Sequence, residues 1–194
     1  TKGNDEARAV AVFALGEIEA EGGEVIAALA AAFNDAQDKV SEQAARLLGQ
    51  IGESAVDELI KSMNDKDLRR PGHAALALSI IGPPAARASD GLLTMLKTGD
   101  EDARGYAVFA LSKVAGDKPE VISALIDALQ NDPSEYSVRV YAAEALGRIA
   151  PPVRAAIPAL TAALKHSHEA VRQAAADALT DIKHPERNTW RTAR

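Results

Sequence analysis

A short motif, Ala-Leu-Gly-x-Ile in its fullest form, recurs six times along this chain of 194 residues. Its leucines fall at positions 15, 48, 78, 111, 146 and 179, so successive copies are 33, 30, 33, 35 and 33 residues apart. A period in this range is typical of solenoids, in which each unit buries its apolar face only against its neighbours. The repeat therefore predicts an elongated array rather than a single central core.

Four of the six copies end a longer pattern, V/A-R-x-x-A-x-x-A-L-G-x-I, with the spacing of an amphipathic helix. In Val171–Ile182, apolar residues fall at i, i+4, i+7, i+8 and i+11, which is one face of a helix. A second apolar pattern, as in Val121–Leu129, follows the motif and predicts a second helix. We therefore expect an all-α, right-handed α-solenoid of about five and a half helix pairs.

Polar breaks between the helix pairs, such as Asn34-Asp35 and Asn64-Asp65, predict the unit boundaries. The expected array covers residues 1–183, and residues 184–194 form a C-terminal tail. Both ends of the array look like ordinary repeats rather than polar caps, so we expect this chain to belong to a larger polypeptide or assembly. The expected units are about 5–35, 36–65, 66–99, 100–132, 133–166 and 167–183.

Three glycines directly follow a motif helix, at positions where a left-handed residue would end the helix without a Cβ clash. These are Gly52, Gly82 and Gly116.

The charge distribution bears on partners. The net charge is −6, and residues 1–60 hold four Lys/Arg against twelve Asp/Glu. Nucleic-acid affinity depends largely on neutralising phosphates, so this balance argues against a nucleic-acid partner. The acidic end either keeps the chain soluble or docks a basic partner. No apolar stretch of about 18 uncharged residues occurs, so we expect no membrane insertion.

Cysteine is absent, which excludes disulfides, thiolate metal sites and a cysteine nucleophile. The chain contains no segment resembling a targeting signal. This slightly favours the cytoplasm, but the sequence leaves the compartment unknown.

The motifs at Val171–Ile182 and Ala156–Lys165 resemble the HEAT-repeat superfamily, in particular the short HEAT-like repeats of the phycobilin lyase type. The resemblance extends from about Glu6 to Lys183. It implies that the second helix of each pair lines a concave surface on which partners dock. It also implies that the motif arginines form an internal ladder, paired with an acidic residue or backbone of an adjacent turn. These arginines are Arg8, Arg104, Arg139 and Arg172.

Resemblance to HEAT-like enzymes raises catalytic alternatives. A relative of deoxyhypusine hydroxylase would carry several His-Glu pairs for two irons, whereas only His168-Glu169 occurs here. His166 and His168 suit a capping or solvated pair better than a metal site, because a metal needs three or four converging ligands. A HEAT-like DNA glycosylase would need a basic groove. We expect no metal and no cofactor, and a lyase-type or accessory enzyme acting on a tetrapyrrole-carrying or other protein remains the alternative.

Two near-identical segments, 7–15 and 103–111, each place a phenylalanine where other units have arginine, leucine, glutamate or aspartate. Phe13 and Phe109 therefore either form exposed contacts or pack against a neighbouring helix. Polar residues on the second helices complete the candidate partner-binding set: Asp57, Glu58, Lys61, Ser89, Asp90, Thr94, Ser123, Asp127 and Thr161. The sequence thus predicts a non-catalytic scaffold that binds a protein or peptide on the concave face of the array.

Overall fold

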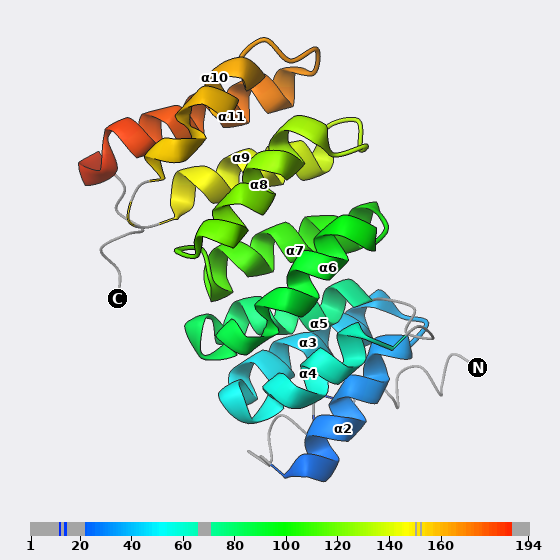
Figure 1. Cartoon of the computed structure of the whole chain (residues 1–194). Coiled ribbons are helices and arrows are strands. Elements are labelled where there is room, and N and C mark those ends of the chain that lie inside the picture. Colours follow the sequence, from blue (N-terminus) through cyan, green and yellow to red (C-terminus); the bar gives the residue numbers. More distant parts are fainter. Residues whose placement is uncertain are drawn as a thin grey trace.

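The computed structural model describes Val12, Ala14 and residues 22–65, 71–149, 151 and 153–187. Over these residues the chain forms helices that stack in pairs, from α2 at one end of the array to α11 at the other (Figure 1). The α-helices are α2 (Gly23–Ala31), α3 (Asp38–Ile51), α4 (Val56–Met63), α5 (Pro71–Ile81), α6 (Ser89–Thr98), α7 (Glu101–Val114), α8 (Pro119–Asn131), α9 (Ser137–Arg148), α10 (Ile157–Ala163) and α11 (Glu169–Lys183).

Short 3-10 helices link or end several of these elements. They are η1 (Ala32–Asn34), η2 (Gly52–Ala55), η3 (Pro83–Ala88), η4 (Arg154–Ala156) and η5 (Pro185–Arg187). The predicted all-α class is confirmed, and the proposed division into units stays a prediction.

The helices lie in two layers. The ALG helices, which carry the repeat motif, are α3, α5, α7, α9 and α11, and each packs against the next along the array. The second helices, α2, α4, α6, α8 and α10, form the other layer and touch one another much less. The core lies between the layers, where the motif leucines Leu48, Leu78, Leu111 and Leu146 are fully buried. Each buried leucine contributes roughly 2 kcal/mol of hydrophobic free energy.

Small residues set how closely the ALG helices approach. A Cβ added to Gly147 would lie 2.8 Å from the Ala178 Cα, and one added to Gly49 would lie 2.6 Å from the Ile80 Cβ. Only glycine permits such proximity. The ALG helices therefore contact one another more extensively along the array than the second helices do. The expectation that the second helices line a concave surface stays a prediction.

For two of the three glycines predicted to end a motif helix, the prediction is confirmed. Gly52 has a φ of 83° and Gly82 a φ of 72°, a region that is readily open to glycine alone. The expectation for Gly116 is wrong, because α7 ends at Val114, its C-cap is Ala115 with a φ of −153°, and Gly116 has no positive φ. A Cβ on Gly116 would instead meet the Ser112 carbonyl oxygen at 2.6 Å, so this glycine serves close packing.

Some expectations concern residues outside the described part of the chain. Arg8 and Phe13 are among them, as is the tail beyond Arg187. Within the described residues, no helix has the length and apolarity needed to cross a bilayer.

Candidate functional site

The ALG helices of the middle units carry large apolar side chains that the core does not bury. Tyr106 and Phe109 of α7 are 36% and 41% exposed, and Tyr141 of α9 is 49% exposed. Ile80 of α5 is also exposed. Because exposed aromatic side chains grouped on adjacent elements often belong to binding surfaces, this group is the leading candidate site.

The tyrosines are positioned by glycines in the preceding ALG helix. The Tyr106 ring packs on Gly72 of α5, where an added Cβ would lie 2.4 Å from Cδ2 of the ring. The Tyr141 ring packs on Gly105 of α7 in the same way, with two ring carbons 3.2 Å from the Cβ position. Each ring therefore lies against the preceding helix, which holds the aromatic side chain in place on the surface.

These side chains line a pocket between α5, α7 and α9, which we call the aromatic pocket. It has a volume of about 380 Å³. Its apolar residues come from all three helices, while two carboxylates from the first turn of α7 lie at its edge. The lining includes Leu76, Tyr106, Phe109, Tyr141, Glu101 and Asp102. Glu101 is held toward α9 by a hydrogen bond from the Ser137 hydroxyl.

A second, larger pocket adjoins the first and shares Tyr106 and Asp102 with it. This acidic pocket has a volume of about 630 Å³ and lies near the amino-terminal ends of α3, α5 and α7. Four carboxylates converge there from two helices and the residue that caps α7. The lining includes Asp38, Glu42, Asp100, Asp102, His73 and Tyr106.

Local interactions account for part of this acidic cluster. Asp100 caps α7 by accepting a hydrogen bond from the Ala103 amide at 2.8 Å. Glu42 accepts a hydrogen bond from Arg46 at 2.6 Å, and both side chains are largely exposed. Acidic residues at helix amino termini also interact favourably with the helix dipole. These interactions stabilise the helices on which the carboxylates lie.

Aromatic contacts hold His73 in the wall of the acidic pocket. His73 is buried, and its ring lies 6.2 Å from that of Phe33 and 6.1 Å from that of Tyr106, centroid to centroid. This packing makes it a structural residue of α5.

Sequence reasoning did not find this group. Phe109 was singled out as either exposed or packed against a neighbouring helix, and the structure shows it exposed. Tyr106 and Tyr141 were missed, although both follow a motif arginine by two positions. That regular placement, at the fourth position of the pattern, was the available signal.

The arginine ladder implied by the family resemblance is confirmed for the three described members. Arg139 donates hydrogen bonds to the carbonyls of Leu129, Gln130 and Asp132. Arg172 donates to the carbonyls of His166 and Ser167. These bonds satisfy carbonyl groups at the ends of helices and in the breaks between units. The ladder is therefore part of the scaffold rather than of a binding site.

Arg104 makes the ladder's one described bidentate ion pair. Its Nε donates to Oδ2 of Asp132 at 2.8 Å, and its Nη2 donates to Oδ1 at 3.1 Å. The side chains are only 12% and 4% exposed. Burial by itself would raise the pKa of Asp132, but the hydrogen bonds from Arg104 and Ser134 outweigh it and lower that pKa. The hydrogen bond to Asp132 also raises the pKa of Arg104.

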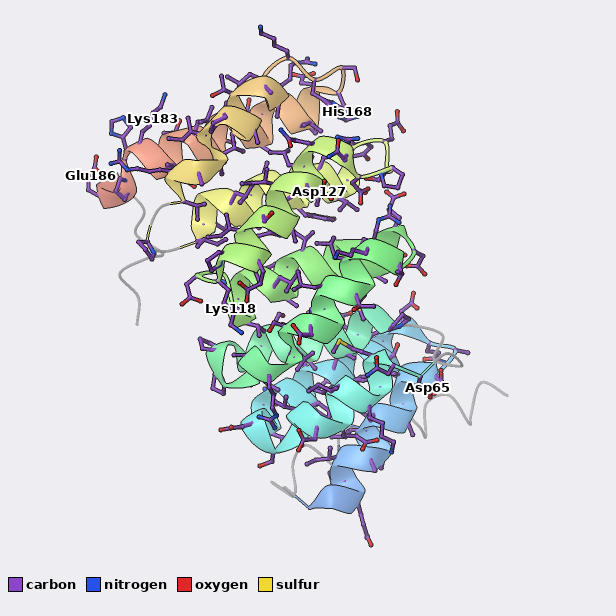
Figure 2. The ribbon with its side chains drawn as sticks, viewed as in Figure 1. Asp65, Lys118, Asp127, His168, Lys183 and Glu186 are labelled. Carbon is purple, nitrogen blue, oxygen red and sulfur yellow. The ribbon has the colours of Figure 1, made fainter. Side chains whose placement is uncertain are left out.

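The polar residues predicted on the second helices form no shared site, and none lines the aromatic or the acidic pocket. All are at least partly exposed except Ser89, which is buried. Asp127 lies on α8 in the layer opposite the ALG helices (Figure 2). These residues are Asp57, Glu58, Lys61, Ser89, Asp90, Thr94, Ser123, Asp127 and Thr161.

Most of these polar groups have local partners. Asp57 pairs with Arg87 at 3.0 Å, and Glu58 pairs with Lys61 at 3.2 Å. The Thr94 and Thr161 hydroxyls donate to backbone carbonyls of their own helices. Such interactions are typical of a solvated helix surface.

The two histidines before α11 accept hydrogen bonds from nearby backbone amides, and the His166 Nδ1 accepts one from the His168 amide at 3.1 Å. The His168 Nδ1 accepts a hydrogen bond from the Ala170 amide at 3.2 Å and so caps the helix. Its ring stacks on Tyr136 with centroids 3.9 Å apart, and it lies at the start of α11 (Figure 2). Within residues 22–65, 71–149, 151 and 153–187, together with Val12 and Ala14, no group of three or more His, Cys, Asp or Glu could hold a metal.

Comparison with solved structures shows which architecture the chain shares. A designed armadillo repeat protein in complex with the peptide (KR)4 is 21% identical, with a TM-score of 0.57, covering 89% of this chain and 92% of that one. A second engineered protein is 24% identical, with a TM-score of 0.55, covering 89% of this chain and 53% of that one. At these identities the likeness concerns the fold alone.

No curated protein matches the sequence. The family model for HEAT repeats, by contrast, matches in overlapping segments at residues 1–79, 26–112, 89–153 and 122–188. These matches agree with the paired helices, the tight ALG layer and the arginine ladder described above. The chain belongs to the HEAT-repeat family.

Proposed function

We propose that this HEAT-repeat array is a non-catalytic scaffold that binds a protein or peptide segment on its ALG layer. The observation that carries the proposal is the aromatic pocket, where Tyr106, Phe109 and Tyr141 are exposed on two neighbouring helices. Aromatic side chains supply much of the affinity at protein interfaces because they bury a large area at little entropic cost.

The scaffold favours binding without rearrangement. The rings of Tyr106 and Tyr141 are backed by Gly72 and Gly105, and the helices below them pack on a fully buried core. A partner therefore meets side chains that are already ordered, so less entropy is lost on binding. Several modest contacts along such a surface suffice for specific recognition.

The layer of second helices is the competing docking surface, as the sequence reasoning expected. Its candidate residues, including Asp57 and Asp127, are exposed but lie outside both pockets. A test of the proposal therefore has to compare the two layers directly.

The experiment is selection from a displayed library of random twelve-residue peptides on the wild-type array. Selected peptides are then titrated against Phe109→Ser, Tyr141→Ser and, as the matched control on the other layer, Asp127→Ala. All three replaced side chains are exposed, and circular dichroism verifies that each variant is folded. We expect the two aromatic substitutions to weaken binding roughly tenfold or more and Asp127→Ala to leave it unchanged.

Two results would contradict the proposal. Peptides that bind all aromatic variants equally but lose affinity for Asp127→Ala would move the docking surface to the second helices. Tight binding of an open-chain tetrapyrrole, followed by its absorbance and unaffected by the aromatic substitutions, would favour the lyase-type alternative.

A further inference from the structure

We propose that the partner is a segment carrying a lysine or arginine close to a large apolar residue. This inference rests on the proposed function and specifies the chemistry of the partner. The apolar side chain enters the aromatic pocket, and the basic side chain lies against the acidic pocket. We infer the chemistry of this segment from the apolar lining of the aromatic pocket and from the charged residues that border it.

The first step is that the two pockets form one continuous surface. Tyr106 and Asp102 line both of them, so a segment bound in one pocket reaches the other without crossing a wall. The acidic pocket involves α3, α5 and α7, and the aromatic pocket involves α5, α7 and α9. Their centres are therefore offset by about one helix spacing, roughly 9 Å. That distance corresponds to about three residues of extended chain.

The second step concerns charge. Asp38, Glu42, Asp100 and Asp102 line the acidic pocket, and no lysine or arginine appears among its described lining residues. The Asp102 carboxylate is exposed and, among the described residues, takes part in no hydrogen bond or ion pair. Because Glu42 already pairs with Arg46 and Asp100 caps α7, the charge inference rests on Asp102, whose carboxylate attracts a cation. Guanidinium and ammonium groups match carboxylates in charge and as hydrogen-bond donors.

The third step concerns direction. At the other end of α7, the ammonium of Lys113 lies 6.0 Å from the centre of the Phe109 ring. Along α7 the surface thus changes from acidic at Glu101 and Asp102, through the aromatic pocket, to basic at Lys113. A bound segment places its basic residue toward Asp102 and its apolar residue beside Phe109. The opposite orientation would bring its cation next to Lys113, which costs free energy.

The test uses three displayed libraries of twelve-residue peptides that differ only at two fixed positions three residues apart. The first fixes Arg and Leu, the second Glu and Leu, and the third Arg and Ser. Each library is selected on the wild-type array, and enriched peptides are titrated by fluorescence anisotropy. We expect peptides with Arg and Leu to bind roughly tenfold more tightly than those with Glu and Leu. We also expect their affinity to fall as salt is raised.

Three variants assign the contacts. Asp102→Lys should reverse the preference, so that Glu-Leu peptides gain affinity as Arg-Leu peptides lose it. Phe109→Ser should weaken both Leu-containing classes. Asp127→Lys makes the same charge change at an exposed position on α8 and should alter nothing beyond a slight general effect of net charge. Circular dichroism again verifies the fold of each variant.

The outcomes separate the two proposals. Equal enrichment of the Arg-Leu and Glu-Leu libraries, with binding lost in Phe109→Ser, would overturn the charge inference and leave the docking surface in place. Enrichment that does not depend on Phe109 would overturn both. Self-association that saturates the surface and is abolished by Phe109→Ser would show that the occupant is a second copy of this chain, which also overturns the inference.

Discussion

Gly72 of α5 packs against the ring of Tyr106 of α7 so closely that a Cβ on the glycine would stand 2.4 Å from Cδ2 of the ring. The same relationship recurs one helix along, where Gly105 packs against Tyr141 with ring carbons 3.2 Å from the Cβ position. Glycine in one unit thus positions an aromatic side chain of the next, and this contact couples stability to the proposed binding surface.

Gly72→Ala tests that coupling. The methyl group would displace the Tyr106 ring or push α5 and α7 apart, at a cost of about 1–3 kcal/mol. Urea unfolding followed by circular dichroism should show this loss. Gly105→Ala is the matched control, since its looser contact is offset by the better helix propensity of alanine. We expect the control to remain within about 1 kcal/mol of wild type. Equal effects of the two substitutions would contradict the packing described for Tyr106.

The positive φ of Gly82 makes a second prediction. An alanine there would have to adopt a φ of 72°, so Gly82→Ala should destabilise the array by about 1–2 kcal/mol. Gly23→Ala serves as the comparison, because Gly23 is the first residue of α2, its φ is not positive and nothing lies within 4 Å of an added Cβ. Alanine there restricts the unfolded chain and favours the helix, so stability should be unchanged or rise by up to about 1 kcal/mol. The midpoint of thermal unfolding should therefore fall below that of wild type in Gly82→Ala, and it should stay equal to or above that of wild type in the comparison variant.

The Arg104–Asp132 pair should contribute more than any exposed pair of the array. Asp132→Asn leaves the Arg104 guanidinium little exposed and without its charged partner, so we expect a loss of about 3 kcal/mol in the free energy of unfolding. Glu42→Gln removes the exposed pair with Arg46 and should cost less than about 1 kcal/mol. A double-mutant cycle with Arg104→Met and Asp132→Asn measures the coupling directly. A coupling near zero would show that the two side chains stabilise the array independently.

The lowered pKa of Asp132 predicts a dependence of stability on pH. Its folded pKa lies below the ordinary value of 3.8, so the folded state keeps this carboxylate ionised more readily than the unfolded state does. The resulting stabilisation is present above pH 3.8 and is lost as the pH falls through the folded pKa. In Asp132→Asn, the free energy of unfolding should fall less steeply below that pH. Identical slopes in wild type and variant would contradict the assignment.

The repeat pattern was sufficient to predict the architecture. The motif leucines recur every 30–35 residues, and Leu48, Leu78, Leu111 and Leu146 are all fully buried. Helical periodicity identifies such positions because each buried position of a helix favours an apolar residue, whatever residues the neighbouring unit contains. The helix ends at Gly52 and Gly82 could also be predicted from the local sequence, because a positive φ depends on the backbone at that residue. The same prediction was wrong for Gly116 because α7 ends two residues before it, at Val114.

The candidate site depended on contacts between units, which no local pattern encodes. Phe109 stood out in the sequence because it replaced charged residues of other units, but its grouping with Tyr106 and Tyr141 arises only when α7 and α9 are packed together. The close approach of the ALG helices at Gly49 and Gly147 is likewise a contact between units. The sequence by itself thus determined the helices, their pairing and their buried faces, since these follow from periodicity. The tertiary structure alone decided which exposed residues meet, because that depends on the distances between helices.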